Sequence, residues 1–220
     1  MTLSRSEVTV GLVDELAGFG ELIGPLDEKA WATPTRCAGW SVADVAAHVI
    51  GSMADVVGGR LEGLGSPEVT AREVAERQGR SAAELTAELA TVTKLAAELA
   101  GAFDDAAWAA PAPGGYDGSL GEGVEALWYD TFLHGDDIRA ALGRPTERGP
   151  GVRVSVVHVA MMLDKAGWGP ATLRFEGMEP VTVGEGGPVL GGDPMPFVLA
   201  ATGRGDPVPL GLDSSVNVYA

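Results

Sequence analysis

Residues 81–99 carry the pattern that most constrains the fold of this chain. Apolar residues recur there at intervals of four, three, four and three, the spacing of one face of an α-helix. They are Leu85, Leu89, Val92, Ala96 and Leu99. The preceding Ser-Ala-Ala-Glu at 81–84 forms a capping box, which marks a helix start. The pattern therefore predicts a capped helix of about 20 residues with one buried face.

Three other long helices are predicted in the first two thirds of the chain. Apolar spacing and a second capping box, Ser41 to Asp44, indicate where they lie. Their expected ranges are residues 7–24, 41–58 and 120–142. A short polar helix is expected from Pro67, and residues 104–118 are expected to form a loop. Four long helices with connections of this length favour a four-helix bundle.

The character of the sequence changes after Pro145. We therefore predict two domains, a helical one over 1–145 and a small α+β one over 146–220. The second is expected to contain a helix over 151–166, strands in 171–177 and 179–187, a helix capped by Asp193, and a short strand within 206–220. The predicted fold class is α+β.

Composition and charge exclude several classes of function. The 220 residues carry a formal net charge of −16, which opposes binding to nucleic acids and to anionic membranes. The longest strongly apolar stretch without a charge, 154–163, is about half a membrane span. The start of the chain does not resemble a signal peptide, and the single Cys37 cannot form an internal disulfide. A cytoplasmic protein without nucleic-acid or membrane partners is expected.

Two histidines and an aspartate have the spacing of a candidate metal site. Asp130 and His134 are four residues apart on one predicted helix, so their side chains project together, and His48 faces inward from another helix. A buried acid is costly unless it is paired or bound to a metal. Three such ligands would leave a metal ion with open positions for catalysis. From spacing alone, a simple Asp–His hydrogen bond beside an unrelated core histidine is favoured over a metal site, because such acid–histidine pairs are common in helical proteins.

Three segments together resemble one known family. They are TPTRCAGWSVADVAAH at 33–48, DTFLHGDDIRAALGRP at 130–145, and Ala-Thr-Gly-Arg at 201–204. In this order they are similar to the mycothiol-dependent maleylpyruvate isomerase family. The resemblance implies an N-terminal DinB-like metal-binding four-helix bundle followed by a small α+β C-terminal domain.

The resemblance also implies a site and a chemistry. His48, Asp130 and His134 match the family's three metal ligands, which normally bind zinc. The metal would bind mycothiol, the usual small thiol of actinobacteria, as a thiolate that attacks a small electrophilic substrate. The family usually has Glu where this chain has Asp130, and the shorter side chain reaches less far towards a metal.

Asp137 and Arg204 are further candidates for the site. Asp137 is expected either to accept a hydrogen bond from a ligand histidine or to form an ion pair with Arg139 or Arg153. Arg204 matches the family's C-terminal arginine. It could hold a carboxylate of the substrate or cofactor, or it could be a surface charge at a helix end.

Other residues are expected to be structural. Cys37 is expected to be a packed side chain, and His158 to be a core histidine rather than a fourth ligand. Glu73 is expected on a solvated helix face. The tryptophans expected in the core are Trp31, Trp40 and Trp128.

The sequence therefore predicts a metal- and mycothiol-dependent isomerase or S-transferase. Two alternatives remain open: a non-catalytic small-ligand or stress-response binding protein with a weakened metal site, and a metal-dependent hydrolase that activates water. The sequence specifies neither the substrate, nor the metal, nor the oligomeric state.

Overall fold

The computed structural model describes residues 3–220, and their contacts divide them into two compact units. The first unit is Ser4–Glu147, and the second is Arg148–Ala220 with Leu3. The division falls beside the domain boundary predicted between residues 145 and 146.

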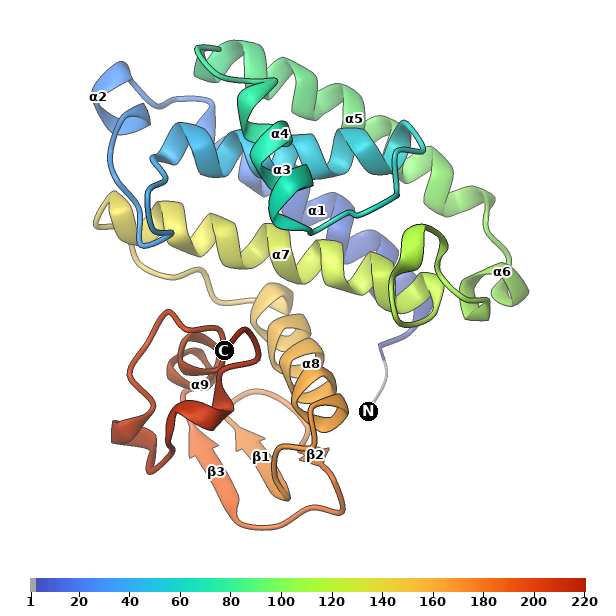
Figure 1. Cartoon of the computed structure of the whole chain (residues 1–220), viewed down its shortest axis with the longest axis vertical. Coiled ribbons are helices and arrows are strands. Elements are labelled where there is room, and N and C mark those ends of the chain that lie inside the picture. The colour runs from blue at the N-terminus through green and yellow to red at the C-terminus, as the bar shows by residue number, and fades with distance from the viewer. Residues whose placement is uncertain (1–2) are drawn as a thin grey trace. The chain divides into compact units, whose positions relative to one another are not determined.

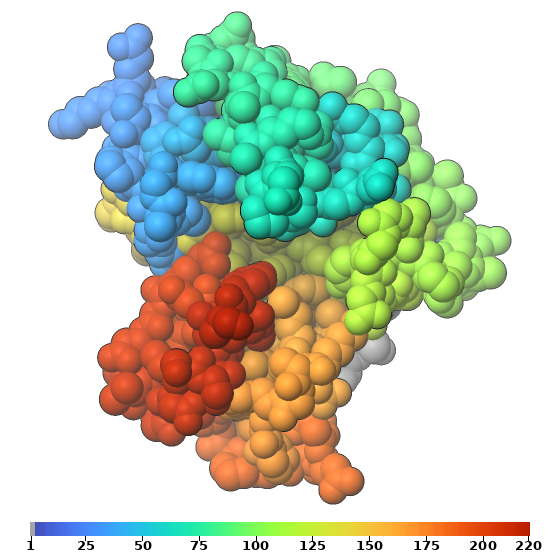
Figure 2. Space-filling view, viewed as in Figure 1, coloured from blue at the N-terminus to red at the C-terminus, as the bar shows by residue number. Residues whose placement is uncertain are grey.

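The first unit is a bundle of four long helices with shorter ones between them (Figure 1). The long helices are α1 (Arg5–Ile23), α3 (Val42–Val57), α5 (Ala82–Ala102) and α7 (Leu120–Ala141). The short ones are α2 (Glu28–Trp31), α4 (Pro67–Ala75) and α6 (Asp105–Ala109). Helix α1 packs against α5 and α7, while α3 packs against α4, α5 and α7. In Figure 2, α4 and its flanking loops lie over α3 on the visible face of the bundle.

The four long helices begin at serine residues with complete capping boxes. Each serine side chain accepts from the backbone N–H three residues on, and an acidic residue there bonds back to the serine. The serines are Ser4, Ser41, Ser81 and Ser119. On α5 the predicted apolar face is buried from Leu85 to Ala96, whereas Leu99 near the helix end is partly exposed. Local sequence therefore determines where these helices begin and which face they bury.

The second unit contains two helices and a three-stranded sheet. Its elements are α8 (Pro150–Lys165), β1 (Ala171–Phe175), β2 (Val181–Val183), β3 (Val189–Gly192) and α9 (Pro194–Ala201). The sheet order is β2-β1-β3, with β1 antiparallel to β2 and parallel to β3. Helix α8 packs against β2 and α9. The core of this unit includes Leu173, Phe175, Val183 and Phe197.

The α+β fold class is confirmed, but three local predictions are wrong. Segment 104–118 contains α6 and a 3-10 turn rather than only loop. Strand β3 was not predicted because its two glycines and exposed residues give no alternating pattern. The tail holds 3-10 turns at Val208–Leu210 and Ser214–Val216 instead of a strand. The prolines at 207 and 209 lack the N–H groups that a strand needs.

None of the helices described is both long enough and apolar enough to cross a membrane.

Candidate metal centre

His48, Asp130 and His134 meet between α3 and α7. His48 Nε2 lies 3.5 Å from Asp130 Oδ2, and His134 Nε2 lies 3.4 Å from Asp130 Oδ1. One ligand atom from each of the three residues lies within 4.8 Å of the others. The imidazole centroids are 5.1 Å apart with nearly perpendicular planes. The structure therefore brings together the three residues that the sequence singled out.

These separations fit a divalent metal ion. Nitrogen and oxygen ligands about 2.0–2.2 Å from a tetrahedral zinc ion lie about 3.4 Å from each other. The separations from Asp130 Oδ2 to His48 and from Asp130 Oδ1 to His134 are each close to that spacing, with one carboxylate oxygen facing each ring. Both are longer than a good hydrogen bond between nitrogen and oxygen. Two imidazole nitrogens and a carboxylate are also a donor set that zinc accepts.

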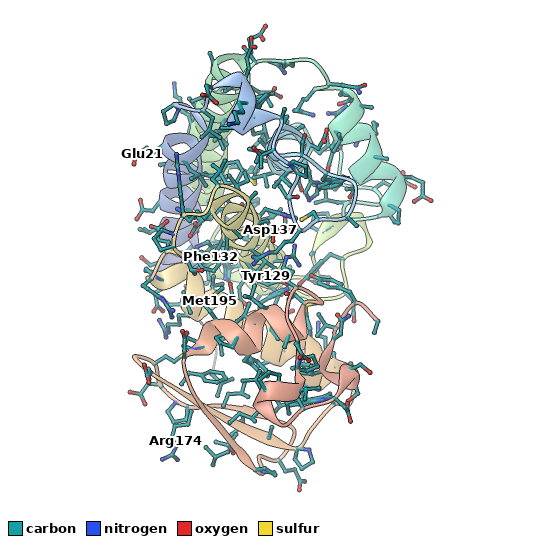
Figure 3. The ribbon with its side chains drawn as sticks, turned by 90° about the vertical axis from the view of Figure 1, so that its left-hand side faces the viewer. Glu21, Tyr129, Phe132, Asp137, Arg174 and Met195 are labelled. Atoms are coloured by element: carbon teal, nitrogen blue, oxygen red, sulfur yellow. The ribbon has the colours of Figure 1, made fainter. Side chains whose placement is uncertain are left out.

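The other nitrogen of each ring is held by a buried carboxylate. His48 Nδ1 donates to Glu73 Oε2 at 2.8 Å, and His134 Nδ1 donates to Asp137 Oδ2 at 2.9 Å. Glu73 is 1% exposed and Asp137 is fully buried. Metal-binding histidines commonly have such a partner, which fixes the ring so that its Nε2 lone pair faces the metal. Figure 3 shows Asp137 on α7, within the bundle.

The prediction that Glu73 lies on a solvated helix face is wrong. Helix α4 packs against α3 at Gly51, where a β-carbon would lie 2.6 Å from Glu73 Cβ. Asp55 on α3 is buried and forms ion pairs with Arg60 and Arg72, the latter on α4. These contacts turn Glu73 towards His48. The glycine three residues after His48 was the one sequence feature that pointed to a close neighbour.

The loop that precedes α3 completes the surroundings of both histidines. The Trp40 ring centroid lies 5.3 Å from that of His48 and 6.3 Å from that of His134. Trp40 is half-buried, so it packs against the site rather than in the centre of the core as expected. Cys37 is also half-buried, and its Sγ donates to Asp137 Oδ2 at 3.0 Å.

Cys37, His134 and Asp137 form a second group of possible metal ligands. This group is the poorer candidate because its atoms already bond to one another and to a cation. Asp137 accepts from His134 and from Cys37, and Arg36 forms an ion pair with it. A metal ion there would have to displace these bonds. The group of His48, Asp130 and His134 is therefore the favoured ligand set.

Electrostatics around the ligands favour a cation. Partial burial acts to raise the pKa of Asp130, but the neighbouring His134 and His48 outweigh it and hold the pKa well below its usual range. Burial acts to lower the pKa of His134, yet Asp130, Asp137 and Cys37 raise it well above the ordinary value. The pKa of His48 is raised despite burial, because the carboxylates of Asp130 and Glu73 lie beside the ring and favour its charged form. Without a metal, protonated imidazole rings therefore supply the positive charge that the surrounding carboxylates attract.

His158 and Arg204 belong to the second unit. His158 is buried on α8, and neither group of possible ligands found in the described part of the chain includes it. Arg204 follows α9, and its Nη1 donates to the carbonyl oxygen of Thr202 at 3.3 Å. A contact between Arg204 and a substrate or cofactor carboxylate stays a prediction.

Comparisons with known proteins agree on one family. The family model described as the mycothiol maleylpyruvate isomerase N-terminal domain matches residues 12–139. A crystal structure of the mycothiol-dependent maleylpyruvate isomerase is similar, with a TM-score of 0.64, 16% identity and 93% of each chain covered. The crystal structure of a histidine-to-alanine mutant of that isomerase has a TM-score of 0.64, 17% identity and the same coverage. At these identities the structural likeness concerns the fold. No match was found among curated proteins.

Proposed function

Because the chain belongs to the mycothiol maleylpyruvate isomerase N-terminal domain family, we propose that it is a metal- and mycothiol-dependent enzyme. Its reaction would be isomerisation of a small electrophilic substrate, or S-transfer, in which the thiol stays attached to the substrate through its sulfur. The observation that carries the proposal is the arrangement at Asp130, whose two carboxylate oxygens face the Nε2 atoms of His48 and His134.

The chain's own residues would hold and orient the metal. Glu73 and Asp137 fix the two imidazoles, which keeps both Nε2 lone pairs directed at the space beside Asp130. A divalent ion, by our proposal zinc, would supply the Lewis acidity that favours the thiolate form of a thiol at neutral pH, since a free thiol has a pKa of about 8.5.

Exposure at the site indicates how reactants reach it. The Asp130 side chain is 36% exposed, whereas those of His48 and His134 are 9% and 10% exposed. Solvent therefore reaches the centre on the Asp130 side. The thiol and the electrophile would approach there, while Trp40 packs against both imidazole rings. Because the nucleophile is the cosubstrate thiol, the enzyme needs no nucleophilic side chain of its own.

The short side chain of Asp130 is compatible with this proposal. Relatives usually carry Glu at this position, and the shorter reach raised the possibility of a weakened site. In this chain Asp130 already spans the two histidines at separations that suit shared coordination. We propose that aspartate here keeps the site competent.

Turnover assays test the function. We expect purified protein loaded with zinc to consume a small electrophile such as maleylpyruvate only when mycothiol is present, and His48→Ala to abolish this turnover. Turnover without thiol would instead identify a metal-dependent hydrolase. Metal binding without any thiol-dependent turnover, across a panel of electrophiles, would favour a non-catalytic binding protein.

A further inference from the structure

Arg36 bridges two buried carboxylates next to the candidate metal centre. Its Nε donates to Asp137 Oδ1 at 2.5 Å, and its Nη2 donates to Asp136 Oδ2 at 2.6 Å. Asp137 is fully buried and Asp136 is 2% exposed, while the Arg36 side chain is 24% exposed. Arg36 therefore joins the loop before α3 to α7 at the turn of α7 that also carries His134.

This fork fixes the orientation of the Asp137 carboxylate. One oxygen of Asp137 accepts from Arg36, and the other accepts from His134 Nδ1 and Cys37 Sγ. A buried carboxylate is costly without a positive partner, and two adjacent ones more so. Guanidinium is planar and presents several donors at set angles, so one arginine pairs with one oxygen of each aspartate and limits the rotation of both carboxylates.

The two histidines of the site are supported differently. Glu73 uses Oε2 for His48, but its other oxygen, Oε1, is buried with no hydrogen-bond partner in the described part of the chain. Asp137, in contrast, is held at both oxygens. The ring of His134 is therefore fixed by a connected series of bonds that starts at Arg36.

We propose that Arg36 is a positioning residue for His134 and acts through Asp137. The inference rests on the proposed metal-dependent function, because its consequence is the direction of the His134 Nε2 lone pair. Arg36 itself bonds to Asp136 and Asp137 rather than to the three ligands. Its effect passes from the Asp137 carboxylate to the Nδ1 proton and so to the tilt of the ring.

Zinc affinity in the full chain is the first test. Substituting a residue that supports a metal ligand commonly weakens metal binding about 10- to 100-fold, and we expect Arg36→Met to weaken zinc binding about tenfold in chelator competition. Arg36→Lys keeps the charge without the fork, so it should recover part of the loss. The matched control is Arg148→Met, because Arg148 also donates two hydrogen bonds to a carboxylate, that of Asp193, and both residues belong to the second unit, which contains none of the three candidate ligands.

A double substitution separates positioning from general stability. If Arg36 acts through Asp137, then Arg36→Met in an Asp137→Asn background should cause no further loss of zinc affinity. Additive losses would overturn the proposal. So would an Arg36→Met protein that binds zinc as tightly as wild type. Circular dichroism of each variant shows whether it is folded.

Nitrogen NMR of the metal-free protein gives a readout that does not depend on metal. We expect wild type and Arg148→Met to show a His134 Nδ1–H that is hydrogen-bonded to Asp137 and protected from exchange with solvent, and Arg36→Met to lose that protection. Retained protection in Arg36→Met would contradict the role of Arg36. If wild type binds no zinc but this pattern holds, the proposed function fails while the positioning of His134 by Arg36 stands.

Discussion

At the scale of single residues, Asp130 is the group on which the proposed metal site depends. It lies one helical turn before His134, and its two oxygens face one histidine each. It is also the most exposed of the three candidate ligands. A change that keeps the shape of this side chain but removes its charge is therefore the most selective perturbation.

Asp130→Asn should weaken zinc binding about tenfold or more. Substituting a residue that only supports a metal ligand already weakens metal binding by about that factor. The amide is a poorer ligand for zinc than a carboxylate, although it fills the same space. Chelator competition measures the effect, with Asp130→Glu, which keeps a carboxylate at this position, as a control that should keep binding. Equal affinity of wild type and Asp130→Asn would contradict the role of Asp130.

Glu15 makes the stability of the first unit depend on pH. Burial raises its pKa to about 7 from 4.5, and Glu147 adds to the shift, while Trp128 and Arg139 oppose it. The folded state then holds a proton that the unfolded state releases, so stability falls as pH rises from 4.5 to about 7. Glu15→Gln should be more stable than wild type at pH ~8, by on the order of 1–3 kcal/mol, and similar near pH ~4.

Urea denaturation at the two pH values checks this expectation. The Glu15 carboxylate accepts from Trp128 Nε1 at 3.3 Å, a bond that the glutamine oxygen can keep. A stability difference that does not change with pH would show that burial of the charge is not its cause.

Sequence reasoning found the three candidate ligands and one residue that supports them, Asp137, but not Arg36 or Glu73. His48, Asp130 and His134 lie on helices whose periodicity predicts that they face inward, and the resemblance to the family then singled them out as candidate ligands. Arg36 and Glu73 reach the site from a loop and a short helix. Their positions depend on contacts between segments distant in sequence, and the local spacing of residues does not predict such contacts.

At the scale of elements, the contact between α3 and α4 positions Glu73. Gly51 lets the helices approach, and the ion pairs of Asp55 with Arg60 and Arg72 hold them together. A capping box predicted α3 and a proline at its first position predicted α4, yet neither signal specifies how closely two helices pack. Strand β3 was missed because its residues give no alternating pattern, and its pairing with β1 joins segments that local sequence does not connect.

Gly51→Ala should destabilise the bundle and weaken zinc binding together. The new methyl group would lie 2.6 Å from Glu73 Cβ and 2.9 Å from Arg77 Nη1, so α4 must shift. Overpacking of this kind typically costs about 1–3 kcal/mol. Urea denaturation and chelator competition measure the two effects.

Gly18→Ala is the matched control, because that helical glycine on α1 has no atom within 4 Å of the added methyl group. It should leave stability unchanged or raise it by about 0.5–1 kcal/mol. If both alanine variants behave alike, the close approach at Gly51 does not position Glu73.

At the scale of the whole molecule, the chain has a net charge of −16 and folds into two compact units. The proposed metal binding would link the candidate site in the first unit to the stability of the folded protein. A ligand that binds only the folded state stabilises it, by about 2.7 kcal/mol at 100 times its dissociation constant. Zinc should therefore raise the melting temperature of wild type, and a chelator should reverse the rise. Calorimetry of His134→Ala should show no such shift, and a shift equal to that of wild type would place the zinc elsewhere.

The most direct test of the central claim is the metal content of the intact protein, measured by native mass spectrometry after zinc exposure and removal of excess. We predict one tightly held divalent ion per wild-type chain and none in His48→Ala or His134→Ala. A wild-type chain that retains no ion, or variants that retain as much as wild type, would contradict a metal centre at His48, Asp130 and His134.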